Sequence, residues 1–409
     1  MKNAATRGQP RALAEVATMI LGQAPHAVLF VGPGSVGKTT LALDLAAGLL
    51  CNDPDPGARP CRNCRGCRQV ASGNHPDLHR LAPDGPGRQV KIGDSSRPDP
   101  GTVRHLLSEL SLLPAEGGAR VAIIEQAHRL NEDAQNALLK MLEEPPPGVT
   151  IILCADDEEC LLPTVRSRCI RVRMGAAGGR EIERWLGELG ASDAPRAARL
   201  ARLAEGRPGL ALAYARSMDA ERLRGEIARG LLDMLRAGRQ TRLATVRELT
   251  KSAVALDAAL DQGRGNGAAD DDAAAPTAKR GRKGKAAKVV EPDGEAAEGD
   301  AAAPKLAAAD RRSAAATLIG IWASVGRDLA ISRAGGAKKI RELELIDELP
   351  VVAPAVSPAT LSAFQAKLAT IATQLDENVN AELALDVLAL AWPHVLPQAM
   401  PGALAGHAR

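Results

Sequence analysis

The stretch that most constrains this chain is residues 27–50, AVLFVGPGSVGKTTLALDLAAGLL. Five apolar residues at 27–31 predict a buried strand, and residues 39–50 predict a helix. Between them, residues 32–39 match G-x-x-x-x-G-K-[ST] at every fixed position, in the strand-to-helix context that this phosphate-binding pattern requires. The order of strand, turn and helix therefore predicts a phosphate-binding loop in an α/β domain.

Phosphate chemistry explains the residue types in this loop. Its glycines let backbone N–H groups turn inward at the start of a helix, where they can cradle phosphate oxygens. Lys38 supplies a charge to the β- and γ-phosphates, and the Thr39 hydroxyl is suited to bind Mg²⁺. We expect ATP or ADP with Mg²⁺ to bind here, although a glycine-rich turn that binds nothing is the alternative. The residues expected to contact the nucleotide are Gly32, Pro33, Gly34, Ser35, Val36, Gly37, Lys38, Thr39 and Thr40.

Composition limits the architecture and the location. A chain of 409 residues is too long for one ordinary core and predicts two or three domains. With three Trp, one Tyr and two Phe, the cores must be mainly aliphatic. A net charge of +3 gives no global signal for nucleic acid. The first 20 residues lack a signal-like apolar run and we find no membrane-length apolar segment, so we expect a cytoplasmic protein with no membrane partner.

A cysteine cluster follows the phosphate-loop helix, in CNDPDPGARPCRNCRGC. Two interlocking C-x-x-C steps and one upstream thiol can close on a single tetrahedral Zn²⁺, as a structural site. Disulfides and a redox C-x-x-C are the alternatives, but a cytoplasmic chain keeps thiols reduced and a redox pair needs only two of them. His75 and His79 lie downstream as possible substitutes for a thiolate. The expected zinc ligands are Cys51, Cys61, Cys64 and Cys67.

A second buried strand is predicted at residues 120–126, RVAIIEQ. In phosphate-loop ATPases an acid at such a strand end helps to hold Mg²⁺, and a second acid beside it orients the attacking water. Glu125 is suited to the first role, but Gln126 stands where the second acid belongs. An amide does not accept a proton from water as a carboxylate does, so we do not expect this site to hydrolyse ATP.

The sequence predicts three further helices and a third buried strand. Residues 11–21 and 103–113 predict helices. Residues 131–144, NEDAQNALLKMLEE, predict a helix that Asn131 caps and the prolines after it end. Residues 149–155 predict a third buried strand, which leads into LLPTVRSRC at 161–169.

Four segments in succession, GPGSVGKT, CRNCRGC, NALLKMLEEPP and LLPTVRSRC, resemble the AAA+ subunits of the bacterial DNA polymerase III clamp loader. The resemblance covers roughly residues 29–172. It implies an α/β AAA+ fold, with a RecA-like parallel sheet that carries the phosphate loop, then a helical lid and an all-α collar domain. Two kinds of subunit share this pattern, zinc module included: the gamma/tau motor and the delta-prime subunit. Gln126, where the motor usually has Glu, and the GRPG at 206–209 favour the delta-prime kind.

The resemblance also assigns roles to single residues. Arg168, in SRC, would be an arginine finger that reaches the γ-phosphate bound by a neighbouring motor subunit; the alternative is a surface arginine in a salt bridge. Arg207, in GRPG, would sense the nucleotide as the lid closes, or only cap a helix. The first sensor residue would fall at 154–156, where no Thr or Asn stands, which also argues against hydrolysis.

We expect an AAA+ domain at 1–174 with a zinc module at 51–67, a helical lid at 175–218 and a helical collar at 219–409. Helices joined by short turns are expected at 178–189 and 194–216, with residues 205–209 between two of them. Further helix is expected at 220–260, from residue 313, and at 359–392. The range of about 262–312 has almost no large apolar residue, which predicts a disordered insertion in the collar. Its basic run at 279–288 is either part of a solvated tether or a weak, salt-sensitive DNA contact.

The resemblance implies a delta-prime subunit of the replicative clamp loader, within the DNA polymerase III holoenzyme, a DNA-directed DNA polymerase. It would bind ATP without hydrolysing it. The implied partners are the gamma/tau and delta subunits, the sliding clamp, and primed DNA through the assembly. The alternatives are an ATP-hydrolysing gamma/tau-type motor, a nucleotide-dependent DNA-binding module acting through the basic insertion, and a scaffold with an empty phosphate loop.

Overall fold

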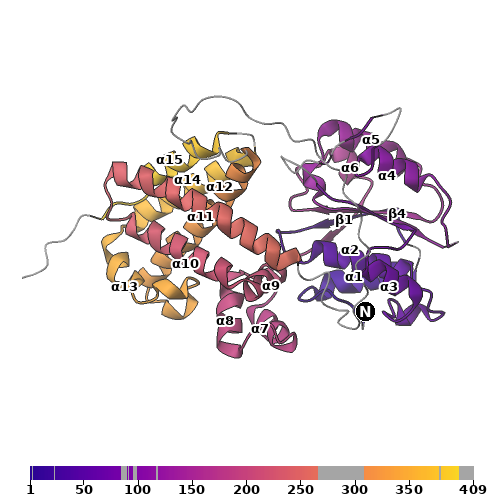
Figure 1. Ribbon diagram of the computed structural model, residues 1–409, viewed down its shortest axis with the longest axis horizontal. Coiled ribbons are helices and arrows are strands. Elements are labelled where there is room, and N and C mark those ends of the chain that lie inside the picture. The colour runs from indigo at the N-terminus through magenta and orange to yellow at the C-terminus, as the bar shows by residue number, and fades with distance from the viewer. Residues whose placement is uncertain are drawn as a thin grey trace, which may run out of the picture.

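The computed structural model describes residues 1–409 except 2, 23, 84–89, 91, 95–98, 117, 266–307, 377–378 and 396–409. Within this part of the chain, a five-stranded parallel sheet with helices on both faces forms the N-terminal domain, and helices alone form the rest (Figure 1). The predicted fold class, a parallel α/β domain followed by helical domains, is therefore confirmed.

The strands of the N-terminal domain lie in the order β2-β3-β4-β1-β5. The strand that leads into the phosphate loop, β1, lies between β4 and β5, with Val28 opposite Ile152 on one side and Ile170 on the other. The elements are α1 (Pro10–Leu21), β1 (Ala27–Val31), α2 (Lys38–Leu49), η1 (Pro56–Ala58), α3 (Arg65–Ala71), β2 (Leu78–Leu81), α4 (Val103–Leu110), β3 (Arg120–Ile124), η2 (Ala127–Arg129), α5 (Glu132–Glu143), β4 (Val149–Ala155), α6 (Pro163–Arg166) and β5 (Ile170–Arg173).

The sheet is buried on both faces because its strands alternate between two hydrophobic clusters. Val28 and Phe30 of β1 pack with residues of α1 and α2, whereas Ala27 and Leu29 pack with residues of α4, α5 and α6. This two-residue period is the geometry of a strand, and burial of both faces is typical of parallel sheets. Figure 1 shows these two helical layers above and below the sheet.

The sequence predicts the central strands better than the edge strands. Residues 27–31 and 149–155 form β1 and β4 as predicted, and Asn131 caps α5 by accepting from the Ala134 N–H. The strand predicted at 120–126 ends at Ile124, two residues early. The edge strands β2 and β5 were not predicted, because LHRL and IRVR each bury only alternate or terminal residues and lack a long apolar run.

The helical part follows β5 directly. In it α7, α8 and α9 stand where the lid was predicted, and α10 to α15 where the collar was predicted. Its elements are α7 (Gly179–Glu188), α8 (Ala194–Leu203), α9 (Pro208–Arg216), α10 (Met218–Asp233), α11 (Arg239–Gly265), α12 (Ala308–Arg333), η3 (Ala337–Lys339), η4 (Leu343–Leu345), α13 (Leu349–Val352), η5 (Ala353–Ala355), α14 (Pro358–Asp376) and α15 (Ala381–Ala391).

Two helices that were predicted as continuous are broken. The range 220–260 is divided between α10 and α11, and 359–392 between α14 and α15, where Asn380 caps α15. The apolar periodicity continues across these two breaks and hides them. In contrast, the range 194–216 forms α8 and α9 with the predicted turn between them, where Glu205 and Gly206 adopt positive φ and Pro208 starts a new helix.

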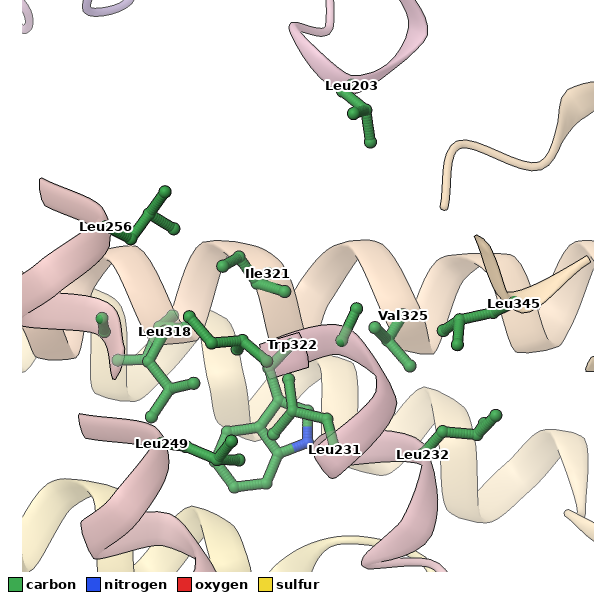
Figure 2. Packing of buried hydrophobic residues seen from close by; sticks show 14 of the residues in the cluster. Leu203, Leu231, Leu232, Leu249, Leu256, Leu318, Ile321, Trp322, Val325 and Leu345 are labelled. Atoms are coloured by element: carbon green, nitrogen blue, oxygen red, sulfur yellow. The ribbon is translucent and has the colours of Figure 1, made fainter. Parts of the chain in front are cut away.

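One hydrophobic core unites the predicted lid and the collar. It includes Ile182 of α7, Tyr214 of α9 and Trp322 of α12 among its buried residues. Figure 2 shows Trp322 on α12, close to Leu231 of α10 and Leu249 of α11. The Trp322 ring also packs against the rings of Phe364 and Trp392, with centroids 5.6 and 5.7 Å away. Three of the chain's few aromatic residues thus gather at the centre of the collar.

The central helix α12 corrects one expectation from the sequence. Its residues Ala309–Arg333 are long and apolar enough to cross a membrane by length and composition, with a mean hydropathy of 1.3 over 18 residues. However, 61% of those 18 residues are buried inside the protein, where α12 packs against α10, α11 and α14. The apolar surface of α12 is therefore used by the collar core.

Both helices beside the predicted insertion extend into its range of about 262–312. Helix α11 continues to Gly265 and α12 begins at Ala308, and residues 266–307 lie outside the described residues. The two helices pack side by side, and Asp257 of α11 accepts hydrogen bonds from the Ser313 and Thr317 hydroxyls of α12, at 2.7 and 2.6 Å. The predicted insertion is therefore flanked by two helices that pack against each other.

The packing of the collar core predicts that two similar substitutions lower the free energy of unfolding by different amounts. The indole N–H of Trp392 donates to the Leu231 carbonyl at 2.9 Å, whereas the buried indole N–H of Trp322 has no acceptor among the described residues. Trp392→Phe and Trp322→Phe remove similar volumes, but only the first loses a hydrogen bond. We expect Trp392→Phe to cost about 1 kcal/mol more in unfolding free energy, measured by urea denaturation of both variants. Equal costs, or a greater cost for Trp322→Phe, would contradict this account.

Candidate nucleotide and zinc sites

The phosphate loop, residues 32–39, connects β1 to α2, and its glycines are required by its geometry. A Cβ on Gly32 would lie 2.2 Å from the Met174 carbonyl oxygen, so no other residue fits there. Gly37 precedes α2 with φ 104°, a conformation that side chains disfavour. Lys38, Thr39 and Thr40 then form the first turn of α2. The loop thus places the N-terminus of α2, with its free N–H groups, at the carboxyl end of the sheet.

Lys38, the charged residue of this loop, is buried, with 8% of its side chain exposed. Its ammonium group donates to the carbonyl oxygens of Gly32, at 2.6 Å, and Pro33, at 2.8 Å. It also forms an ion pair with Asp156, 2.7 Å away, at the residue directly after β4. Asp156 was not predicted as a site residue, although the carboxyl-end rule for parallel sheets points to it, since it directly follows a predicted strand.

The lid and the collar both contact the phosphate loop at Ser35. The Gly209 N–H, in the first turn of α9, donates to the Ser35 carbonyl at 3.0 Å. Arg264, in the last turn of α11, donates to the Ser35 hydroxyl at 3.4 Å, so the long helix α11 of Figure 1 reaches the sheet domain at this point. Arg264 was also not predicted, because nothing in its local sequence indicates that a collar helix ends here.

A cavity of about 810 Å³ opens between the phosphate loop, the lid and the collar. Arg207 lines it, and the Nε of Arg207 donates to the Ala204 carbonyl at the end of α8, at 3.0 Å. Burial lowers the pKa of the Arg207 guanidinium below its ordinary value. The position of Arg207 is therefore compatible with both roles predicted for it, sensing a nucleotide as the lid closes and capping a helix. The same cavity is lined by Pro33, Gly34, Ser35, Val36, Arg224, Arg264, Arg327 and Arg341, among others.

The two residues after β3 differ in environment. Glu125 is 17% exposed and pairs with Arg80 of β2, its Oε1 lying 2.6 and 3.0 Å from two guanidinium nitrogens. Gln126 is exposed and adopts a positive φ of 52°. Burial raises the pKa of the Cys154 thiol to about 12, with Glu125 and Asp156 also raising it and Lys38 lowering it. The three charged groups thus converge around Cys154, at the carboxyl ends of β3, β4 and β1.

The four predicted zinc ligands, Cys51, Cys61, Cys64 and Cys67, lie together, with every Sγ within 4.8 Å of the others. The Sγ atoms of Cys51 and Cys64 are 3.8 Å apart. A tetrahedral Zn²⁺ with Zn–S bonds of about 2.3 Å needs sulfurs about 3.8 Å apart, so the cluster fits that metal. The predicted grouping is confirmed, and the distance excludes a disulfide between Cys51 and Cys64.

Backbone N–H groups point at the sulfurs of this cluster. Cys61, Cys64 and Cys67 donate from their N–H groups to the Sγ of the preceding cysteine of the cluster, at 3.5, 3.3 and 3.4 Å. Burial works to raise the pKa of Cys64, but the N–H groups of Cys67 and Asn52 lower it to about 6. Burial raises the pKa of Cys51 and Cys67. This arrangement stabilises at least one thiolate, the form that binds zinc.

Neither downstream histidine joins the cluster. His75 is buried and its Nδ1 accepts from the Asp77 N–H at 3.1 Å, while its Nε2 lies 3.9 Å from Glu116. His79 lies in β2, and burial lowers its pKa. The described metal-ligand cluster consists of the four cysteines, so His75 and His79 act in the packing of the domain.

Arg168 follows α6, on the side of the domain opposite α1 and α2. Its guanidinium pairs with Glu143 of α5 at 2.5 Å and donates to the Thr164 carbonyl at 2.9 Å. A third of its side chain and half of the Glu143 side chain are exposed, at 33% and 49%. The alternative role, a surface arginine in a salt bridge, thus describes Arg168 in the isolated chain.

Residues 8–177 match a family model described as "DNA polymerase III, delta subunit". Subunit delta' of DNA polymerase III from Pseudomonas aeruginosa is 35% identical over 164 residues, which are 40% of this chain and 47% of that protein. Subunit tau from Escherichia coli is 37% identical over 205 residues, 49% of this chain and 30% of that protein. This chain thus matches less than half the length of either relative.

Among solved structures, a DNA polymerase III gamma subunit-related protein from Thermotoga maritima aligns with 93% of this chain and 98% of its own. The sequence identity is 15% and the TM-score is 0.36. The sequence matches above therefore carry the relationship, and the family model covers the sheet domain that holds both candidate sites.

The cysteine cluster yields a prediction about metal content. We expect about one zinc ion per purified chain, since a tetrahedral four-sulfur site holds a single ion. Cys64→Ser should lose most of this zinc and lower the thermal unfolding temperature, because the metal joins the start of α3 to the end of α2. Elemental analysis by mass spectrometry measures the zinc. The control is Cys169→Ser, which lies outside the cluster; a wild type without zinc, or equal zinc in Cys64→Ser, would exclude the site.

Proposed function

We propose that the chain acts as the delta-prime subunit of a DNA polymerase III clamp loader, because residues 8–177 match a DNA polymerase III delta family model and subunits delta' and tau are similar over part of their length. In this role it binds ATP or ADP with Mg²⁺ without hydrolysing it, and it lends an arginine to a motor neighbour. Its partners are the gamma/tau and delta subunits and, through the assembly, the sliding clamp and primed DNA. It works in the cytoplasm.

The observation that best supports this function is a complete phosphate loop next to the ends of β3 and β4, where the carboxylate that directly follows each strand is already paired. Glu125 pairs with Arg80 and Asp156 pairs with Lys38. Gln126, where a motor needs an acid, is an exposed amide. A group that accepts a proton from water must be a free base within reach of that water. These residues therefore favour nucleotide binding over ATP hydrolysis.

The chain's own residues give the bound nucleotide its contacts. The N–H groups of residues 34–39 and the Lys38 ammonium hold the phosphates, and Arg207 approaches from the lid. Thr39 and Glu125 are the proposed ligands of Mg²⁺, which neutralises phosphate charge when it binds. Glu125 must release Arg80 to reach the metal. Zn²⁺ at the four cysteines has a structural role.

Arg168 carries the proposed action on the neighbouring subunit. Its position after α6, with a third of its side chain exposed, leaves the guanidinium accessible to a partner. In the assembly it exchanges Glu143 for the terminal phosphate bound by the motor and stabilises charge that develops in the transition state. We propose the domain division 1–174, 175–218 and 219–409 for this subunit, with the lid and collar sharing one core.

A second candidate is a gamma/tau-type motor, and the identity of 37% to subunit tau favours it. That function requires a group that accepts a proton from the attacking water. Glu125, which directly follows β3, can act as this group only after it releases Arg80. The third alternative, a DNA-binding module that acts through the basic insertion, depends on residues 266–307, which lie outside the described residues.

The delta-prime function predicts the effect of removing Arg168. Motor subunits reconstituted with this chain, clamp and primed DNA should hydrolyse ATP, and Arg168→Ala should lower the steady-state rate on the order of a hundredfold or more, as loss of an arginine finger does. This chain alone should hydrolyse no ATP. The measurement is a coupled ATPase assay of each assembly at equal subunit concentrations.

Arg171→Ala is the matched control, because Arg171 lies nearby on β5 and is also exposed and paired with an acid, Glu158. It should leave the rate unchanged. If Arg171→Ala lowers the rate as much as Arg168→Ala, the loss reflects a general change of surface charge. If the isolated chain hydrolyses ATP and Lys38→Ala abolishes this activity, the chain is a motor and the proposed function is wrong.

A further inference from the structure

Asp156 places a carboxylate inside the mouth of the phosphate loop. Its Oδ1 lies 2.7 Å from the Lys38 ammonium, and its Oδ2 would lie 3.4 Å from a Cβ built on Gly34. The residue directly follows β4, which pairs with β1 and β3 in the centre of the sheet. Its N–H donates to His128 Nδ1 at 3.2 Å. The backbone of Asp156 is therefore anchored, and its carboxylate stays close to the loop.

The Lys38 ammonium is fully engaged by this arrangement. It bonds to the Gly32 carbonyl, the Pro33 carbonyl and the Asp156 carboxylate, and an ammonium group has one N–H for each of these partners. Of these partners only Asp156 is an anion, so it is the one that a phosphate replaces most directly. A nucleotide phosphate that reaches Lys38 must therefore displace Asp156 or share the lysine with it.

We propose that Asp156 is a built-in counter-ion of Lys38 that makes this site prefer a nucleoside diphosphate to a nucleoside triphosphate. The proposal rests on the proposed nucleotide site. The terminal phosphate of ATP brings additional negative charge toward Lys38, whose ammonium the Asp156 carboxylate already contacts at 2.7 Å, and like charges that share one cation repel each other. ADP lacks that phosphate and leaves the ion pair less disturbed. Asp156 thus acts through Lys38 as a positioning residue that sets specificity.

Asp156→Asn tests this directly, because it removes the charge and keeps the shape. The affinities of the full-length chain for ADP and for ATP are measured by titration calorimetry, each with and without Mg²⁺. We expect the wild type to bind ADP more tightly than ATP. We expect Asp156→Asn to raise the ATP affinity on the order of tenfold, with a smaller change for ADP. A residue with a merely structural role would shift both affinities together.

Asp157→Asn is the matched control, since Asp157 is the next residue and is exposed, and its carboxylate accepts a hydrogen bond from the Glu159 N–H within its own turn. It should leave the ratio of the two affinities unchanged. Thermal unfolding of each variant verifies that the fold is kept. An unchanged ATP affinity in Asp156→Asn overturns the proposal, and a fall of ATP affinity seen only with Mg²⁺ makes Asp156 a metal ligand instead.

The same titrations separate this proposal from the proposed nucleotide site. If the wild type binds ADP, Lys38→Ala abolishes that binding, and Asp156→Asn leaves the preference for ADP unchanged, the site stands and only the counter-ion proposal fails. If neither the wild type nor Asp156→Asn binds ADP or ATP, the nucleotide site itself is refuted and the counter-ion proposal with it. Binding of ATP by Asp156→Asn but not by the wild type is its strongest support.

Discussion

The structure depends on one constraint, the convergence of parallel strand ends at one edge of a sheet. Because β1, β3 and β4 run in the same direction, the residues after them meet in space although they are far apart in sequence. This edge receives the phosphate loop after β1, Glu125 after β3 and Asp156 after β4. Lys38 is buried here among carbonyls and a carboxylate, so the charge balance of the site is set by which residue follows each strand.

A second constraint links this edge to the helical part. The lid and collar share one hydrophobic core, so α7 to α9 cannot move far without disturbing the packing around Trp322. Both Gly209 of the lid and Arg264 of the collar contact Ser35. Arg341, before η4, also pairs with Glu205 at 2.9 Å, two residues before Arg207. The phosphate loop is therefore in direct contact with helices α9 and α11.

The sequence predicts those parts of the fold and site in which the signal is local. The phosphate loop, the central strands β1 and β4 and the four cysteines each combine several residues in one short segment, and all were found. The edge strands β2 and β5 are short and half exposed, so their periodicity is weak. Arg80, Asp156 and Arg264 were missed because their roles arise from tertiary contacts to Glu125, Lys38 and Ser35.

The two ion pairs at the functional residues have different strengths, and this difference fits the proposed role. Arg168 and Glu143 are 33% and 49% exposed, and such solvent-accessible pairs contribute about 0–1 kcal/mol, so the exchange of Glu143 for a phosphate that we propose costs little. Lys38 is buried, and removing Asp156 from it without a replacement leaves an uncompensated charge in a partly desolvated place. Arg168 is thus separated from its carboxylate at less cost than Lys38 is from Asp156. The proposed function, in which Arg168 acts on a neighbouring subunit and Lys38 holds this chain's own nucleotide, uses this asymmetry.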